Sequence, residues 1–168
     1  MKTFIIAALT ADGYIGQDAS HLATRWTSHA DKVFFSQKTK EAGAAIFGRT
    51  TFETFNRALP GRRTIVYTSR PESVTVEGVE TIGGSPQEVI EKLEAESVER
   101  LAICGGAHVY AEFLQADLVD EIFINIHPVV FGAGVPLFRE PVQRTLELLE
   151  AKQIGDGTVM LHYAVKKD

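Results

Sequence analysis

Apolar residues occur along this chain in short continuous runs that are separated by glycine-rich turns. Five runs have the length and composition of buried strands: Lys2–Leu9, Ala44–Phe47, Arg63–Thr68, Leu101–Cys104 and Asp120–His127. The first run is apolar at nearly every position, which is typical of a central strand covered on both faces. The pattern therefore predicts a sheet whose inner strands are buried.

Helix signals lie between these runs. A helix is predicted over Asp31–Glu41, with Ser28 as its N-cap and Asp31 in the place that glutamate holds in a capping box. A second helix is predicted over Pro86–Glu96, where Ser85 is the expected N-cap and proline fills the first helical position. Strands and helices thus alternate along most of the chain.

The chain ends in a different pattern. Thr145–Gln153 and Thr158–Lys166 are predicted as two strands that a glycine-rich hairpin turn joins. Val74–Ile82 has a weaker strand pattern. The segment from Gly16 to Trp26 is predicted as an irregular loop. We expect an α/β fold of three layers, with a mostly parallel central sheet and an antiparallel C-terminal hairpin, in a single domain over residues 1–168.

Composition narrows the class of protein. The chain has 168 residues, 45% of them hydrophobic, and a net charge of −5 without any block of Lys or Arg, which argues against nucleic acid as a partner. The apolar runs are too short to cross a membrane, and Asp12 follows the first run too closely for a signal peptide. Cys104 is the single cysteine and cannot form an internal disulfide, so we expect a cytoplasmic protein.

Two glycines interrupt the chain after the run Leu101–Cys104. Helical spacing resumes behind Gly105-Gly106, with Val109 and Phe113 on one face. Glycine lets a ligand approach the backbone closely, and the first N–H groups of a helix attract a phosphate. A tight turn without any ligand explains the same residues, and they do not fit the G-x-G-x-x-G fingerprint.

Turns with polar side chains follow two further predicted strands. Gly48-Arg49-Thr50-Thr51 is another strand-to-helix turn, in which Thr50 or Thr51 is the expected N-cap. Thr68-Ser69-Arg70 closes the next strand. Ligands of open α/β sheets bind at the carboxyl ends of strands, and arginines beside hydroxyls suit phosphate groups. Solvated arginines are the alternative explanation, but two of them together with Gly105-Gly106 favour an extended phosphate-bearing ligand.

Among the acidic residues, Asp31 is the candidate for a functional role. It favours the start of its own helix, and it also lies near Trp26 and Phe35, where a carboxylate can hydrogen-bond a heterocycle or take part in proton transfer. We expect no metal site, because the ligand-type side chains show no shared spacing. They are His21, His29, His108, His127 and Cys104.

Four segments resemble dihydrofolate reductase, and they occur in that family's order. They are Ile5–Leu9 with Ile15-Gly16 and the pair Trp26 and Asp31; Ile46–Glu53, which is similar to Gly-Arg-x-Thr-(Trp/Phe)-Glu; Leu59-Pro60-Gly61-Arg62; and Gly105–Tyr110, which is similar to Gly-Gly-x-x-Val/Ile-Tyr. The resemblance implies NADPH-dependent reduction of a pterin-like ring, with dihydrofolate as the substrate.

The resemblance also implies roles for individual residues. Asp31 would be catalytic: it would bind the pterin amino and ring N–H groups and assist protonation of the ring through water. Arg62 would pair with the carboxylate of a glutamate tail, and Arg49 and Arg70 would favour NADPH through its 2′-phosphate. Gly105-Gly106 would form a cis peptide. Substrate contacts are expected from Ala8, Trp26, Phe35, Phe55, Arg62, Cys104 and Asn125. Cofactor contacts are expected from Ala8, Ile15, Gly16, Gly48, Arg49, Thr50, Thr51, Thr68, Ser69, Arg70, Gly105, Gly106, Ala107, His108, Val109 and Tyr110.

Several positions depart from that family. Arg25 stands where a proline usually precedes Trp26, Asn125 replaces the threonine partner of the acidic residue, and Ala107 replaces a third glycine. The segment His127–Phe138 resembles the reductase domain of riboflavin biosynthesis instead. We therefore keep two alternatives to dihydrofolate reduction: reduction of a ribosylated aminopyrimidine, and nucleotide binding without turnover. The chain is a monomer or a homodimer; the apolar loop Val129–Phe138 is either a dimer contact or, as we prefer, packs under the hairpin.

Overall fold

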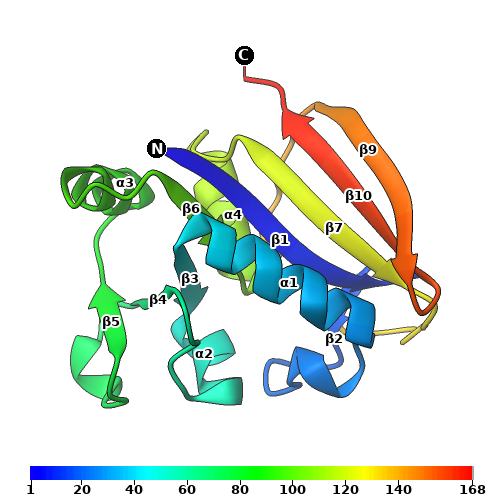
Figure 1. Cartoon of the computed structure of the whole chain (residues 1–168), viewed down its shortest axis with the longest axis horizontal. Helices are drawn as coiled ribbons and strands as arrows, with labels where there is room; N and C mark the ends of the chain where they lie inside the picture. Colours follow the sequence, from blue (N-terminus) through cyan, green and yellow to red (C-terminus); the bar gives the residue numbers. More distant parts are fainter. Residues whose placement is uncertain (168) are drawn as a thin grey trace.

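A large central sheet forms the middle layer of the fold. The computed structural model describes residues 1–167, and within them the sheet has eight strands. In spatial order they are β5 (Val79–Ile82), β4 (Arg63–Tyr67), β3 (Ala44–Gly48), β6 (Arg100–Ile103), β1 (Lys2–Thr10), β7 (Glu121–His127), β10 (Thr158–Val165) and β9 (Leu146–Gly155). The strands from β5 to β7 are parallel, and β10 and β9 add the expected antiparallel hairpin. The predicted fold class is confirmed, including a central β1 (Figure 1).

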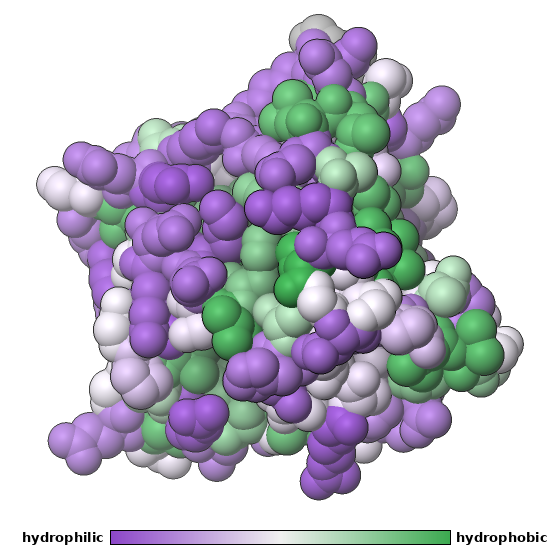
Figure 2. Space-filling view, turned by 45° about the vertical axis from the view of Figure 1, so that its right-hand side comes forward, coloured by the Kyte–Doolittle hydropathy of each residue, from purple (hydrophilic) through white to green (hydrophobic). Residues whose placement is uncertain are grey.

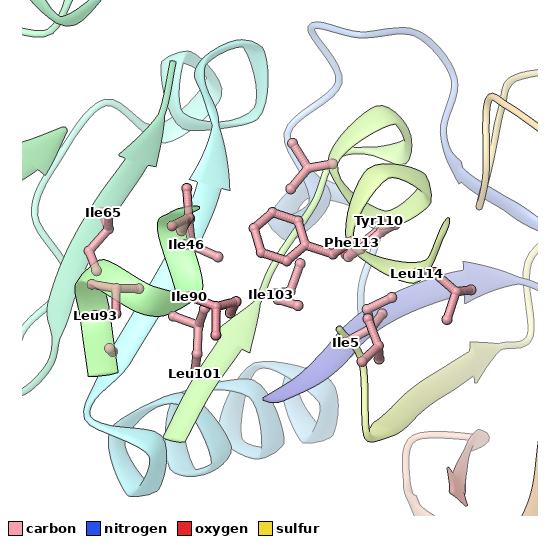
Figure 3. Close-up of a cluster of buried hydrophobic side chains, with 14 of the residues drawn as sticks. Ile5, Ile46, Ile65, Ile90, Leu93, Leu101, Ile103, Tyr110, Phe113 and Leu114 are labelled. Carbon is pink, nitrogen blue, oxygen red and sulfur yellow. The ribbon is translucent and has the colours of Figure 1, made fainter. Parts of the chain in front are cut away.

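Helices cover both faces of this sheet. Side chains alternate along a strand, so Ile5 of β1 joins one core and its neighbour Ile6 joins the other. The core around Ile5 lies against α3 (Pro86–Ala95) and α4 (Ala107–Gln115), and Figure 3 shows strand isoleucines meeting Leu93 and Phe113 from these helices. The other core packs against α1 (His29–Ala42) and α2 (Arg49–Phe55). The result is the three-layer arrangement that the periodicity indicates.

Helix starts are only partly as predicted. Ser28 and Ser85 are N-caps, and each hydroxyl accepts a backbone N–H from the third residue of its helix. The capping box at Ser28 is incomplete, because the Asp31 carboxylate bonds elsewhere. The predicted cap at Thr50 or Thr51 is wrong: α2 begins at Arg49, with Gly48 as an N-cap that has no side chain to offer. The N–H of Gly48 is bound to the Gly105 carbonyl at 2.7 Å, so β3 runs directly into α2.

Two weaker predictions need correction. The loop between Gly16 and Trp26 is not wholly irregular, because a 3-10 helix forms at Ala23–Arg25 and Gly16 ends the short strand β2 (Tyr14–Gly16). This strand pairs with β8 (Val135–Pro136), which gives a small second sheet. The strand predicted over Val74–Ile82 is confined to β5, and a further 3-10 helix, Pro71–Ser73, precedes it. Such short elements depend on tertiary pairing and leave little periodicity in the sequence.

The loop after β7 is only partly buried. Leu137 and Phe138 lie against the core of α3 and α4, whereas Val130 is 71% exposed. Other exposed large apolar side chains are Val33, Leu148 and Leu149. Figure 2 shows that apolar patches on this side of the molecule are interrupted by hydrophilic side chains. Among residues 1–167, the helices are all too short or too polar to span a bilayer.

Candidate active site

One cleft of about 1000 Å³ runs beside the carboxyl ends of three parallel strands. Gly48 at the end of β3, Thr68 after β4 and Gly105 after β6 all line it. The other wall is α1, which contributes Asp31 and Phe35. Parallel strands bring their carboxyl ends to the same edge of a sheet, which is why segments far apart in the sequence share this cleft.

The corner after β6 leaves little room for side chains. Gly105 has a φ of +106°, which side chains rarely allow, and its peptide bond to Gly106 is cis, as expected. A Cβ at Gly106 would lie 2.9 Å from Thr51 Oγ1, and a Cβ at Gly48 would lie 2.9 Å from a methyl group of Val109. The glycines thus let α2 and α4 begin close together beside the cleft.

This corner suits an anionic ligand. Helix α4 begins at Ala107 with Gly106 as its N-cap, and within residues 1–167 no side chain caps it with a hydrogen bond. Hydroxyls of Thr50, Thr51 and Ser69 line the same stretch of the cleft. Free N–H groups at a helix start, hydroxyls and backbone that can be approached closely fit the phosphates of a dinucleotide.

Arg49 and Arg70 were both expected to bind the cofactor at this corner, but only Arg49 lines the cleft. Arg49 lines the cleft and forms an ion pair with Glu53, one turn further along α2. Arg70 is exposed and is not part of the cleft wall. Its backbone N–H is bound by Thr68 Oγ1 at 3.0 Å, in a turn that leads into the Pro71–Ser73 helix. A sequence pattern gives the position of Arg70 after the strand but not the direction in which that turn leaves it.

Asp31 is the buried carboxylate of the cleft. It is 8% exposed and its Oδ1 accepts a 2.7 Å hydrogen bond from the side-chain amide of Asn125 on β7. Burial raises the pKa of Asp31 above its ordinary value, while the Asn125 hydrogen bond and the charges of His127 and Lys32 oppose that rise. A carboxyl group of this kind can hold a proton at a pH where an exposed aspartate has lost it.

Apolar side chains surround the space in front of Asp31. Ala8, Phe35, Phe55, Leu59 and Cys104 line this part of the cleft. Burial raises the pKa of the Cys104 thiol well above its ordinary value, so this cysteine remains neutral. A neutral apolar wall with one carboxyl group suits a flat heterocycle that carries N–H groups.

Arg62 also lines this cleft. Its Nη1 donates to Thr39 Oγ1 at 2.5 Å, and its Nε and Nη2 donate to the Pro60 carbonyl at 3.0 and 2.8 Å. These bonds hold the guanidinium between α1 and the turn before β4. One N–H of Nη2 then has no protein acceptor among the described residues, and the group lines the cleft, where it can bind a carboxylate or a phosphate.

Most of the expected site residues line this one cleft. Those that it brings together are Ala8, Ile15, Gly16, Asp31, Phe35, Gly48, Arg49, Thr50, Thr51, Phe55, Arg62, Thr68, Ser69, Cys104, Gly105, Gly106, Ala107, His108, Val109 and Tyr110.

Three expected site residues do not line the cleft: Arg70, Trp26 and Asn125. Trp26 turns away from it and packs edge-on against His127 and Phe131, with ring centroids 5.1 and 5.3 Å apart. Asn125 is 1% exposed and reaches the cleft only through its bond to Asp31.

The sequence analysis missed several charged residues of the wall. Lys32 and Lys40 lie eight residues apart on α1, with Ser36 between them, and all three line the cleft. Their spacing of four residues was a usable signal, since it places the three side chains along one stripe of the helix, next to the stripe that carries Asp31 and Phe35. Arg139 comes from the loop after β8, where no periodicity could have revealed it.

The comparison with known families agrees with this geometry. The family model for dihydrofolate reductase matches residues 2–131. The chain belongs to this family. The family's name is that of a reductase, and its members and structural neighbours support oxidoreductase chemistry for this chain.

Individual relatives extend over the whole chain. Uncharacterized protein YwjB of Bacillus subtilis is 30% identical over 170 residues, which cover 96% of this chain and 97% of that protein. Dihydrofolate reductase from Enterococcus faecalis, solved with NADP(H) and RAB-propyl, has a TM-score of 0.77 at 25% identity and covers 99% of this chain and 97% of its own. A pyrimidine reductase-like protein from Corynebacterium diphtheriae has a TM-score of 0.82 at 18% identity, with 99% and 92% covered. The last likeness concerns the fold alone.

Proposed function

We propose that this member of the dihydrofolate reductase family reduces dihydrofolate to tetrahydrofolate with NADPH as the cofactor. The observation that carries the proposal is the position of Asp31: a buried carboxyl group, held by Asn125, in the same cleft as the glycine corner at Gly105-Gly106. A proton donor and a phosphate-binding corner in one continuous space are what hydride transfer to a ring next to a protonated nitrogen requires.

The cofactor would be held by the strand ends. The first N–H groups of α4 and the hydroxyls of Thr51 and Ser69 would bind its phosphates, and Arg49 would bind the 2′-phosphate. Ala8, Ile15 and Gly16 would lie against its nicotinamide end. When bound there, NADPH supplies the hydride, and the protein has to orient the two rings and provide one proton.

Asp31 would provide the path for that proton. Its carboxyl group would accept hydrogen bonds from an amino group and a ring N–H of the substrate, which fixes the orientation of the ring. Because burial raises its pKa, a larger share of Asp31 is protonated near neutral pH than of an exposed aspartate. The proton would reach the ring nitrogen through water. Phe35 and Phe55 would pack on the substrate, and Arg62 would bind its glutamate tail.

A second candidate is reduction of a ribosylated aminopyrimidine. It is favoured by the pyrimidine reductase-like neighbour, whose fold is as close to this one as that of the dihydrofolate reductase neighbour. The segment His127–Phe138 favours it as well. In this alternative Arg62 and the lysines of α1 would face a phosphate instead of a carboxylate, and the cofactor site would be unchanged.

The deciding experiment follows the loss of nicotinamide absorbance when the purified protein is given NADPH and each substrate in turn. The expected result is turnover with dihydrofolate that methotrexate inhibits and that D31N lowers by orders of magnitude. Turnover with the ribosylated aminopyrimidine alone would replace the first proposal by the second. NADPH binding without oxidation of the cofactor across the panel would leave a nucleotide-binding protein of this fold.

A further inference from the structure

A buried histidine lies behind Asp31, outside the cleft. His127 is the last residue of β7 and is 2% exposed. Its Nδ1 lies 3.0 Å from the backbone carbonyl of Asn125, and a carbonyl only accepts hydrogen bonds, so Nδ1 carries a proton. The nitrogen that can gain or lose a proton is therefore Nε2, which lies 3.5 Å from the Ser28 hydroxyl.

Two short routes connect this imidazole to Asp31. In the first, the Ser28 hydroxyl faces His127 and also accepts the backbone N–H of Asp31 at 3.1 Å; it lies 2.7 Å from the hydroxyl of Thr158 as well. In the second, Asn125 binds His127 with its backbone carbonyl and Asp31 with its side-chain amide. The cluster joins α1, β7 and β10, so the position of the imidazole affects that of the carboxylate.

The pair of Ser28 and His127 is not a nucleophile and its base. Ser28 does not line the cleft, and its hydroxyl is engaged as the cap of α1. The imidazole is oriented by a carbonyl oxygen, whereas the base of a hydrolase is oriented by a carboxylate. The cluster therefore acts on Asp31 and not on a substrate.

Among residues 1–167, few charged groups lie near the imidazole. From α1 the carboxylate of Asp31 interacts with it, and Lys32 and His29 are exposed neighbours on the same helix. β10 faces it with the neutral Thr158, and Trp26 packs edge-on against its ring. Asp156, in the turn before β10, is engaged by the N–H of Ala30. A positive charge on His127 would thus find its counter-charge in Asp31.

We propose that His127 is a positioning residue for Asp31: it orients the carboxylate through Ser28 and Asn125, and in its charged form it balances the negative charge of Asp31 inside the same buried cluster. The catalytic meaning of this pairing rests on the proposed function, since there Asp31 is the proton path. The pairing itself is a property of the folded chain and can be measured without a substrate.

The first test is the titration of the Asp31 carboxyl carbon by NMR in the wild type, in H127Q and in the control H29Q. Glutamine keeps a hydrogen-bonding side chain but cannot become charged, so H127Q should raise the pKa of Asp31 by about one unit. H29Q removes an exposed histidine two residues from Asp31 and should leave the titration unchanged, because solvent screens that charge. Identical titrations in the wild type and H127Q would overturn the proposal.

A second measurement uses the unmodified protein and does not depend on the folding of a variant. Nitrogen shifts of the His127 ring should show a proton on Nδ1, as its contact with the Asn125 carbonyl requires. A proton on Nε2 alone would contradict this orientation of the imidazole and, with it, the proposal. In the reductase assay, the alkaline limb of kcat in H127Q should move to higher pH together with the Asp31 titration, with little change in KM. A shifted titration in a protein without any reductase activity would support the pairing and contradict the proposed function.

Discussion

The side-chain amide of Asn125 donates a 2.7 Å hydrogen bond to the Asp31 carboxylate, across 94 residues of sequence. The bond runs from β7 to the first turn of α1, so the sheet fixes the position of the acidic group relative to the cleft floor. It also favours the charged carboxylate, whereas burial favours the neutral acid. The chemistry of the site depends on the balance between these two effects.

Replacing the carboxyl group tests its role in proton transfer. D31N should lower the rate of dihydrofolate reduction by roughly 10²–10⁴-fold, which is the usual contribution of a general acid, while the affinity for NADPH changes little. Asparagine keeps an oxygen for the Asn125 bond but cannot deliver the proton. The matched control is D18N, since Asp18 also lines the cleft but is exposed and bound to Ser20. Near-normal turnover in D31N would show that the proton takes another path.

The same substitution should stabilise the fold in a pH-dependent way. The folded-state pKa of Asp31 lies above its ordinary value of 3.8, so its contribution to stability is fully present below that value and is lost as pH rises through the folded pKa. D31N has no such loss. Its melting temperature should therefore exceed that of the wild type by ~2–4 °C at pH 7, and the difference should vanish near pH 4. Thermal unfolding of both proteins at several pH values measures this; a constant difference at every pH would contradict the burial argument.

Removing the partner of Asp31 should have the opposite effect on stability. N125A leaves a buried carboxylate without its amide donor and creates a small cavity, which should cost about 1–3 kcal/mol of unfolding free energy at pH 7. The cost should fall at acidic pH, where the carboxyl group is neutral. N125T restores a donor and should recover part of the loss. Denaturant unfolding of the three proteins at pH 7 and pH 4 gives the comparison, and an equal cost of N125A at both values would indicate a packing effect only.

The sequence predicts the strands, helices and layers of this fold better than the turns between them and the directions of their side chains. The continuous apolar run Lys2–Leu9 and the caps at Ser28 and Ser85 depend on neighbouring residues, and the structure confirms them. The direction of Trp26 depends on contacts with Phe131, more than a hundred residues away, and local spacing carries no trace of such a contact. The start of α2 was misplaced for the same reason, because the carbonyl that binds Gly48 belongs to Gly105.

Among the site residues, too, the positions that depend on local sequence were predicted, and those that depend on distant contacts were not. Positions that follow directly from a strand end or a glycine pair, such as Gly48 and Gly105, line the cleft as expected. Arg70 follows a strand end as well but does not reach the cleft, since its direction is set by the turn that comes after it. Arg139 was missed because it lies in a loop that only the pairing of β8 with β2 brings to the cleft.

Arg49 should set the preference for the phosphorylated cofactor. It lines the cleft next to the hydroxyls of α2, and its ion pair with Glu53 holds it there. R49A should weaken binding of NADPH by about 10–100-fold and leave NADH nearly unchanged, because only NADPH carries the 2′-phosphate. R70A is the matched control and should affect neither cofactor, since Arg70 does not reach the cleft. Equal losses for NADPH and NADH in R49A would place the guanidinium on another part of the ligand.

Arg62 distinguishes a substrate with an anionic tail from one without it. Its guanidinium is held by Pro60 and Thr39, which leaves one N–H of Nη2 without a protein acceptor among the described residues. R62A should raise KM for dihydrofolate by about 10–100-fold with a smaller effect on kcat, because the tail contact is the same in the ground state and the transition state. R62K should not restore binding, since an ammonium group cannot reproduce the planar fork of donors.

The control for Arg62 is a substrate that carries the pterin ring but no glutamate. Its KM should be nearly the same in the wild type and R62A, which separates loss of a tail contact from loosening of the turn that Arg62 ties to α1. R57A supplies a second comparison, because Arg57 also lines the cleft but has no bond to Thr39 or Pro60 among the described residues. If R62A weakens both substrates equally, the residue acts by supporting the cleft wall, and recognition of the tail must come from the exposed lysines of α1.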